Sequence, residues 1–121
     1  MTPEELGERL LESAARVGRV VDALPNTRLG RHVAGQLVRC GTAPAPNYEE
    51  GRAAESRKDF VHKLSICLKE LRESRYWIRL IITAQLLPEK KMADLLDESS
   101  QLRKVIGQSI VTAKQNLQSP Q

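Results

Sequence analysis

Residues 56–87 read SRKDFVHKLSICLKELRESRYWIRLIITAQLL, and the spacing of their apolar side chains decides the fold class. One set of apolar residues recurs at helical steps along this stretch: Phe60, Leu64, Cys67, Leu71, Ile78 and Ile82. A mostly polar set, at steps of four and three, lies on the opposite side: Lys58, His62, Ser65, Lys69, Arg72, Tyr76, Arg79 and Thr83. Two such stripes predict one long amphipathic helix whose apolar side faces a core.

Three further helices are predicted from similar patterns and from signals at their ends. Thr2 is suited to cap the first of them, and Pro3 is suited to its first helical position. Pro44 and Pro46 are expected to bend the second, and the sequence leaves open whether they kink that helix or split it. The predicted helices cover residues 3–24, 27–51 with a kink at 44–46, 56–87, and 89–117.

Four amphipathic helices with short connections predict an all-α fold, an antiparallel up-down four-helix bundle. A chain of 121 residues has the length of one domain, so we expect a single bundle domain over 1–121. Aromatic residues make up only 3% of the chain, which disfavours sheet folds. Hydrophobic residues at 40% and charged residues at 28% are typical of a chain that folds into a packed core.

Few side chains are spaced for catalysis or for metal binding. The one carboxylate–histidine pair at helical spacing, Asp59 and His62, is far fewer ligands than a di-iron bundle needs. Cys40 and Cys67 lie on predicted apolar faces, where a free cysteine serves as a small hydrophobic residue. No glycine-rich phosphate-binding motif and no HExxH motif occurs. We therefore expect a protein that is not an enzyme, with no catalytic residue, no metal and no cofactor.

The cysteines and the hydropathy indicate a cytoplasmic protein. Two cysteines without a CxxC spacing fit buried thiols in a reducing compartment better than a disulfide framework. The most apolar stretch, 77–87, is interrupted by Arg79 and Gln85, so no segment is expected to cross a membrane. The first 24 residues carry several acids at helical spacing, which is not the pattern of a secretory signal.

The positive charge is concentrated on the second and third predicted helices. The chain holds 19 Lys and Arg against 15 Asp and Glu, for a net charge of +4 and a pI of about 9.3. Such a surplus permits binding to RNA or DNA phosphates. The alternative is a solvated face in which Glu70 and Glu73 pair with neighbouring bases. The candidate nucleic-acid-binding residues are Arg28, Arg31, Arg39, Lys58, Lys69, Arg72 and Arg79.

Tyr76 and Trp77 stand beside this basic stripe rather than at the centre of the apolar face. Aromatic residues next to arginines are enriched where proteins meet other proteins. We therefore treat Tyr76 and Trp77 as a candidate interface with another copy of the chain or with a partner. The alternative is that Trp77 closes the edge of the bundle's own core.

A more specific pattern lies at the bend. Residues 43–52 read APAPNYEEGR and residues 56–60 read SRKDF. They resemble a signature with a proline-containing bend, then Asn, then Glu-Gly, then a Ser-x-Lys-(Asp/Glu)-Phe helix start. The signature is that of the bacterial four-helix-bundle proteins encoded in intervening sequences of 23S rRNA genes. These are similar to the accessory variability determinant proteins of diversity-generating retroelements. The resemblance covers about residues 5–115.

The resemblance implies an up-down bundle that assembles as a ring-like homopentamer. In the retroelement branch it implies binding to a reverse transcriptase and to nucleic acid, and it transfers no catalytic residue. The residues that match the signature are Asn47, Glu50, Gly51, Lys58 and Phe60. Ala45 stands where the family usually has proline, and Tyr48-Glu49 stands where Ile-Ala is typical.

We interpret the signature as structural. Asn47 and Glu50 are expected to bond backbone groups freed by the prolines, and Gly51 is expected to allow the turn into the next helix.

Two functions remain open at the level of the sequence. The first is an oligomeric accessory protein that binds RNA or DNA through basic helix faces, with a reverse transcriptase as the further partner that the resemblance implies. The second is an assembly module that binds other proteins and has no affinity for nucleic acid. In both cases we expect the chain to bind itself and not a membrane.

Overall fold

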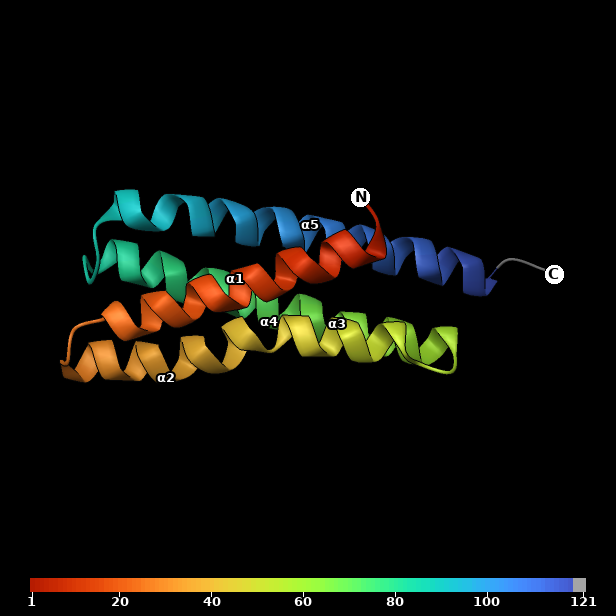
Figure 1. The fold of residues 1–121 in the computed structure, drawn as a ribbon, viewed down its shortest axis with the longest axis horizontal. Helices are drawn as coiled ribbons and strands as arrows, with labels where there is room; N and C mark the ends of the chain where they lie inside the picture. Colours follow the sequence, from red (N-terminus) through yellow and green to blue (C-terminus); the bar gives the residue numbers. More distant parts are fainter. Residues whose placement is uncertain (119–121) are drawn as a thin grey trace.

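The computed structural model describes residues 1–118, so the last three residues of the predicted domain lie outside it. Five helices follow one another along the chain: α1 (Pro3–Ala23), α2 (Arg28–Thr42), α3 (Pro44–Arg52), α4 (Arg57–Thr83) and α5 (Glu89–Gln118). They form four antiparallel arms, because α2 and α3 lie end to end in one arm (Figure 1). No strand occurs in the described part of the chain. The predicted all-α, up-down four-helix bundle is confirmed.

Side-chain caps fix where three of the helices begin. Thr2 Oγ1 accepts a hydrogen bond from the Glu5 backbone N–H at 3.1 Å. Thr27 caps α2 through the Gly30 N–H at 3.0 Å, and Ser56 caps α4 through the Asp59 N–H at 3.1 Å. Each cap satisfies one of the backbone donors that a helix start leaves unpaired.

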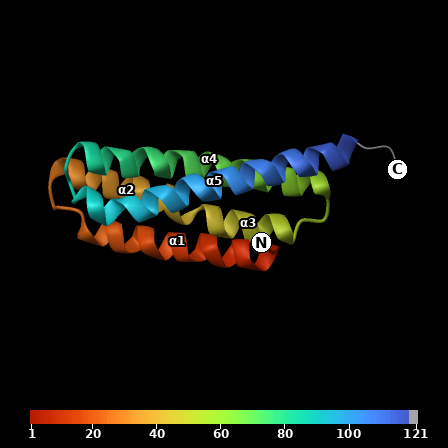
Figure 2. The same ribbon diagram turned by 90° about the horizontal axis from the view of Figure 1, so that it is seen from above.

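The two prolines after Ala43 divide the second predicted helix without reversing its direction. The single helix predicted over 27–51 is therefore two helices, α2 and α3. Ala43 between them keeps a helical backbone, with φ −77° and ψ −33°. The Asn47 N–H donates to the Ala43 carbonyl at 3.2 Å, and the Asn47 side-chain amide donates to the same oxygen at 2.9 Å. The arm consequently bends at one residue and continues (Figure 2).

The end of α4 also differs from the prediction. The helix stops at Thr83, whereas the apolar pattern suggested that it continues to residue 87. Gln85 has a φ of 57°, and it is the one non-glycine residue with a positive φ in the described chain. The Leu86 N–H reaches back to the Ile81 carbonyl at 2.9 Å, as expected for a helix closed by a left-handed residue. Leu86 and Leu87 pack against the core from the connection instead.

The core consists of two clusters, one in each half of the bundle. One includes Leu6, Leu10, Leu64 and Ile106, and the other includes Val33, Ile78 and Met92 among others. Three buried serines, Ser13, Ser74 and Ser99, lie near the level at which the halves meet. No helix in the part of the chain that the structure describes is long and apolar enough to cross a membrane.

Candidate nucleic-acid interface

The basic residues predicted from the sequence lie on two neighbouring arms, α2 and α4. All seven side chains are exposed: Arg28, Arg31, Arg39, Lys58, Lys69, Arg72 and Arg79. The four on α4 share the outer side of that helix, because the opposite side packs into the core. From Lys58 to Arg79 the helix rises by about 30 Å, at roughly 1.5 Å per residue. That length matches several consecutive phosphates of an extended nucleic-acid strand.

Most of these cations have no protein partner. Among the described residues, no hydrogen bond or ion pair involves Lys58, Lys69, Arg72 or Arg79, and Arg28 is equally free. We call these four residues of α4 the α4 basic stripe. Their charge is therefore available to an anionic ligand and is not neutralised locally.

Arg39 is different, because two carboxylates of α4 hold it. Its guanidinium donates to Glu70 at 3.2 Å and makes a second, shorter bond to Glu73. The hydrogen bond from Arg39 holds the pKa of Glu73 below its ordinary value, and the same bond raises the pKa of Arg39. Glu70 and Glu73 therefore do pair with a base, as the alternative expected, but the base lies across the seam on α2 and not nearby on their own helix. Arg39 braces α2 against α4.

Arg31 is intermediate between these two cases. Its Nη1 donates to the backbone oxygen and to the side-chain oxygen of Asn26, at 3.2 and 3.0 Å. Both acceptors are neutral, so no acid compensates the positive charge of Arg31, which lies at the exposed start of α2, close to Arg28.

The structure separates the two aromatic residues of the predicted interface. Trp77 is half-buried, its indole N–H donates to Glu73 at 3.1 Å, and its ring meets the edge of His32 of α2 at 5.7 Å. Trp77 thus closes the seam between α2 and α4. Tyr76 is 57% exposed and packs edge-on against Trp77, with ring centroids 5.1 Å apart. It lies on the outer side of α4, between Arg72 and Arg79 in the sequence.

The signature residues build the junction of α3 and α4. Asn47 bonds a backbone carbonyl at the bend, as expected, but Glu50 does not, because its carboxylate lies 3.2 Å from Lys63 Nζ of α4. Gly51 does not form the turn, since no glycine within residues 1–118 has a positive φ. A Cβ at Gly51 would stand 3.1 Å from Leu64 Cδ1, a tight contact, so glycine favours the close approach of the two helices there.

Tyr48, at the position where the family has Ile, lies in the core. It is 4% exposed, and its hydroxyl donates to the Pro3 carbonyl at 3.4 Å. The larger side chain therefore links α3 to the start of α1. This role of Tyr48 was not predicted, and the available signal was an aromatic residue in an otherwise polar segment.

The remaining titratable groups in the described part of the chain form no metal-binding cluster. Burial raises the pKa of the Cys40 thiol to about 11 and that of the Cys67 thiol to about 12. Both sulfurs lie near backbone carbonyls, of Leu37 at 3.8 Å and of Pro44 at 3.5 Å. Within residues 1–118 no three His, Cys, Asp or Glu side chains gather in a metal-binding arrangement.

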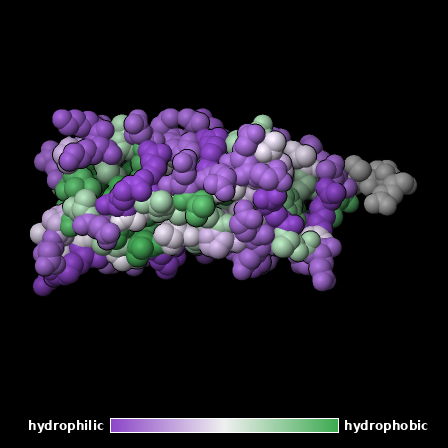
Figure 3. Space-filling model, viewed as in Figure 1, coloured by the Kyte–Doolittle hydropathy of each residue, from purple (hydrophilic) through white to green (hydrophobic). Residues whose placement is uncertain are grey.

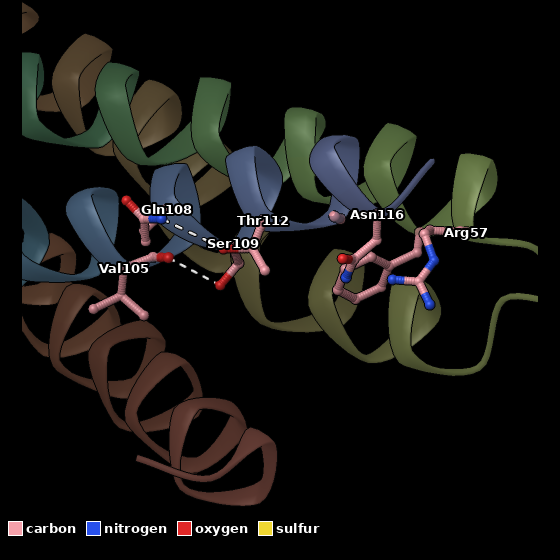
Figure 4. A pocket seen from close by; sticks show the side chains of 8 residues that line it. Arg57, Val105, Gln108, Ser109, Thr112 and Asn116 are labelled. Carbon is pink, nitrogen blue, oxygen red and sulfur yellow. Dashed lines mark hydrogen bonds between the residues drawn. The ribbon is translucent and has the colours of Figure 1, made fainter. Parts of the chain in front are cut away.

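The last turns of α5 extend beyond the start of α1 (Figure 1). Residues of α4 and α5 line a hollow of about 440 Å³ there (Figure 4). Phe60 of the signature and Val105 and Ala113 of α5 give it an apolar lining. Ser109 and Gln108 on its wall bond within α5, to the Val105 carbonyl at 2.9 Å and to Thr112 at 3.4 Å. Arg57 supplies its one charge. The lining residues form a concave, mostly apolar surface, and they include no acid–base pair.

Comparison with known proteins identifies the family. A family model described as "23S rRNA-intervening sequence protein" matches residues 8–108. A crystal structure from Bacteroides thetaiotaomicron, of a protein of unknown function from the S23 ribosomal protein family, is similar in fold, with a TM-score of 0.81. It is 30% identical, and the similarity covers 87% of this chain and 97% of that chain. A search of curated proteins gives no match. The chain belongs to the family of 23S rRNA-intervening sequence proteins.

Proposed function

We propose that this member of the family of 23S rRNA-intervening sequence proteins is a self-assembling accessory protein, not an enzyme, that binds RNA or DNA phosphates. The observation that carries the proposal is the α4 basic stripe, whose four cations are exposed and unpaired along one helix face. Arg28 and Arg31 extend the positive surface onto α2. Tyr76 offers an exposed ring between two of the arginines, and aromatic rings stack on unpaired bases.

Self-assembly strengthens the proposal in physical terms. One chain carries a net charge of +4, which supports only weak binding to nucleic acid. Several copies held together present several stripes to one strand, and the second contact then forms at a high effective concentration. The family resemblance suggests a homopentamer, and a reverse transcriptase as a further partner is compatible with the same assembly.

The test is the binding of a labelled single-stranded RNA across a salt series. We expect sequence-tolerant binding that weakens steeply as salt rises. Arg72→Glu combined with Arg79→Glu should weaken binding by at least about tenfold and flatten the salt dependence by about two ion equivalents. The matched control is Lys104→Glu with Lys114→Glu, because both lysines are exposed on α5 and the charge change is equal. Binding that ignores salt, or that both pairs reduce equally, would contradict the assigned face.

The second candidate function is a protein assembly module without affinity for nucleic acid. The exposure of Tyr76 favours it, because a large aromatic side chain in solvent is typical of a binding hot spot. This function requires that wild-type protein binds no RNA at physiological salt, and that Tyr76→Ser abolishes binding to a partner protein. The RNA titration therefore separates the two functions in one experiment.

A further inference from the structure

Two grooves flank α1, and they carry opposite charge. The first lies between the start of α1 and α3, and its lining residues are Glu4, Gly7, Glu8, Leu11, Ala45, Pro46, Glu49 and Arg52. We call it the acidic flank, because its three carboxylates outnumber the one guanidinium. Arg52 is already engaged by Glu4 at 2.9 Å and Glu49 at 3.7 Å, which leaves Glu8 unpaired. The negative charge of this flank is only partly compensated.

Leu11 projects from the acidic flank into solvent. Its side chain is 57% exposed, although leucine is among the residues most often buried. Glu8 stands one helical turn before it on the same helix, and the apolar Ala45 and Pro46 line the same groove. Protein interfaces place an apolar centre within a polar rim, and Leu11 with Ala45 and Pro46 would supply such a centre here.

The second groove lies on the other side of α1, between its last turns and α5. It encloses about 270 Å³, and we call it the basic groove. Its floor is apolar and is formed by Val20, Ala23, Leu87, Met92 and Leu95. Its rim carries Arg16, Arg19 and Lys91, and none of these has an ion pair among the described residues. Apolar side chains reach the surface between α1 and α5 at this end of the molecule (Figure 3).

We propose that a second copy of this chain docks its acidic flank on the basic groove, with Leu11 seated on the apolar floor and Glu4 and Glu8 facing Arg16 and Arg19. The inference deepens the self-assembly of the proposed function and rests on it. A second copy fits this groove because the two surfaces are complementary. The apolar Leu11 of one copy faces the apolar floor of the other, and the acids of the flank face the bases of the rim. Complementary rim charges of this sort fix the register of an interface and speed its formation.

The contact joins two different surfaces, so it is heterologous. An open chain of copies then keeps one free acidic flank at one end and one free basic groove at the other until the chain of contacts closes on itself. Because the two surfaces lie on opposite sides of one helix, successive copies are turned relative to one another. Such contacts form a closed ring when the turn divides the circle, and an open filament when it does not.

The experiment reverses each charge pattern separately and then both together. Glu4→Lys with Glu8→Lys gives a chain whose flank and groove are both basic, and Arg16→Glu with Arg19→Glu gives a chain in which both are acidic. Each variant alone should sediment as a single chain of 13.6 kDa, whereas wild type sediments as a larger particle. The chain with all four substitutions has complementary surfaces again and should assemble like wild type.

Mixing the two double variants supplies the second arm of the test. A contact between two copies of the same double variant brings like charges together. A contact between the two different variants brings opposite charges together. Their equimolar mixture should form particles larger than one chain that contain both variants, in strict alternation wherever the number of copies is even. Leu11→Ser should weaken assembly at unchanged charge. The matched controls are Glu55→Lys with Asp94→Lys, and Lys104→Glu with Lys114→Glu, at exposed positions outside both grooves.

The outcomes separate this inference from the proposed function. Wild type that remains a single chain at all concentrations would overturn both the inference and the self-assembly. Double variants that assemble like their controls would overturn the inference alone, and would leave self-assembly to another surface. A four-substitution chain and an equimolar mixture that both remain single chains would also overturn it, provided that circular dichroism shows folded helices. Recovery of assembly in either arm supports it, because restored charge complementarity is the one feature the two arms share.

Discussion

At the scale of single residues, the two buried thiols have a measurable consequence. Cys40 and Cys67 are fully buried, and burial raises the pKa of each above the value of 9.0 that a free thiol has. A raised pKa in the folded state means that the stabilising effect is complete below pH 9. It is lost as the pH rises toward 11 and 12, because the unfolded chain ionises first.

We therefore expect the free energy of unfolding to fall by roughly 1.4 kcal/mol per thiol for each pH unit above 9. Urea unfolding at a series of pH values between 8 and 10.5 measures this slope. Lysine and tyrosine side chains titrate in the same range, so the control is Cys40→Ala with Cys67→Ala. The difference between the two slopes isolates the thiols. Equal slopes in wild type and control would show that the thiols ionise freely in the folded protein.

Arg39 shows what the sequence does and does not predict at this scale. Its charge and its place on the exposed face of a helix were predicted correctly, and its exposure is confirmed. Its engagement by Glu70 and Glu73 depends on how α2 packs against α4, since the partners lie 31 and 34 positions away in the sequence. Helical periodicity identifies the face of a residue, but it does not identify the neighbour across a seam.

At the scale of the helices, the end of α4 is the clearest case of tertiary structure overriding a pattern. The apolar run through Leu86 and Leu87 continues the helical spacing, yet the helix closes at Thr83. Both leucines still reach the core, from a connection that starts with Gln85 in the left-handed region. Apolar spacing predicts burial well here, and it predicts the helix end poorly because a turn can bury the same side chains.

Replacement of Gln85 by glycine is expected to stabilise the protein. A residue with a side chain pays a steric penalty at a φ of 57°, and glycine does not. The free energy of unfolding should rise by about 0.5–1 kcal/mol for Gln85→Gly. The same substitution inside a helix, Gln108→Gly in α5, should lower it by about 1 kcal/mol. Urea denaturation of the two variants should thus give shifts of opposite sign, and two negative shifts would contradict the account of the cap.

At the scale of the whole molecule, the two proposed surfaces do not compete for space. The α4 basic stripe lies on the outer side of α4, and the grooves lie on either side of α1. These two arms are diagonal in the bundle, each in contact with the arm of α2 and α3 and with α5. An assembly built along α1 consequently leaves every basic stripe open to solvent, so assembly should increase the affinity for long ligands and not block it.

The length of the RNA provides the last test. Leu11→Ser removes the proposed anchor of assembly without changing the net charge and without touching α4. An oligonucleotide too short to span two copies should bind wild type and Leu11→Ser within about a factor of two, because each stripe is intact. A long single strand should lose at least about tenfold in affinity in the variant, because the gain from linked contacts disappears. Fluorescence anisotropy at fixed salt with both ligands measures the ratio. An equal loss for the short and the long strand would mean that Leu11 belongs to the nucleic-acid surface itself, and that the division of the molecule into an assembling side and a binding side is wrong.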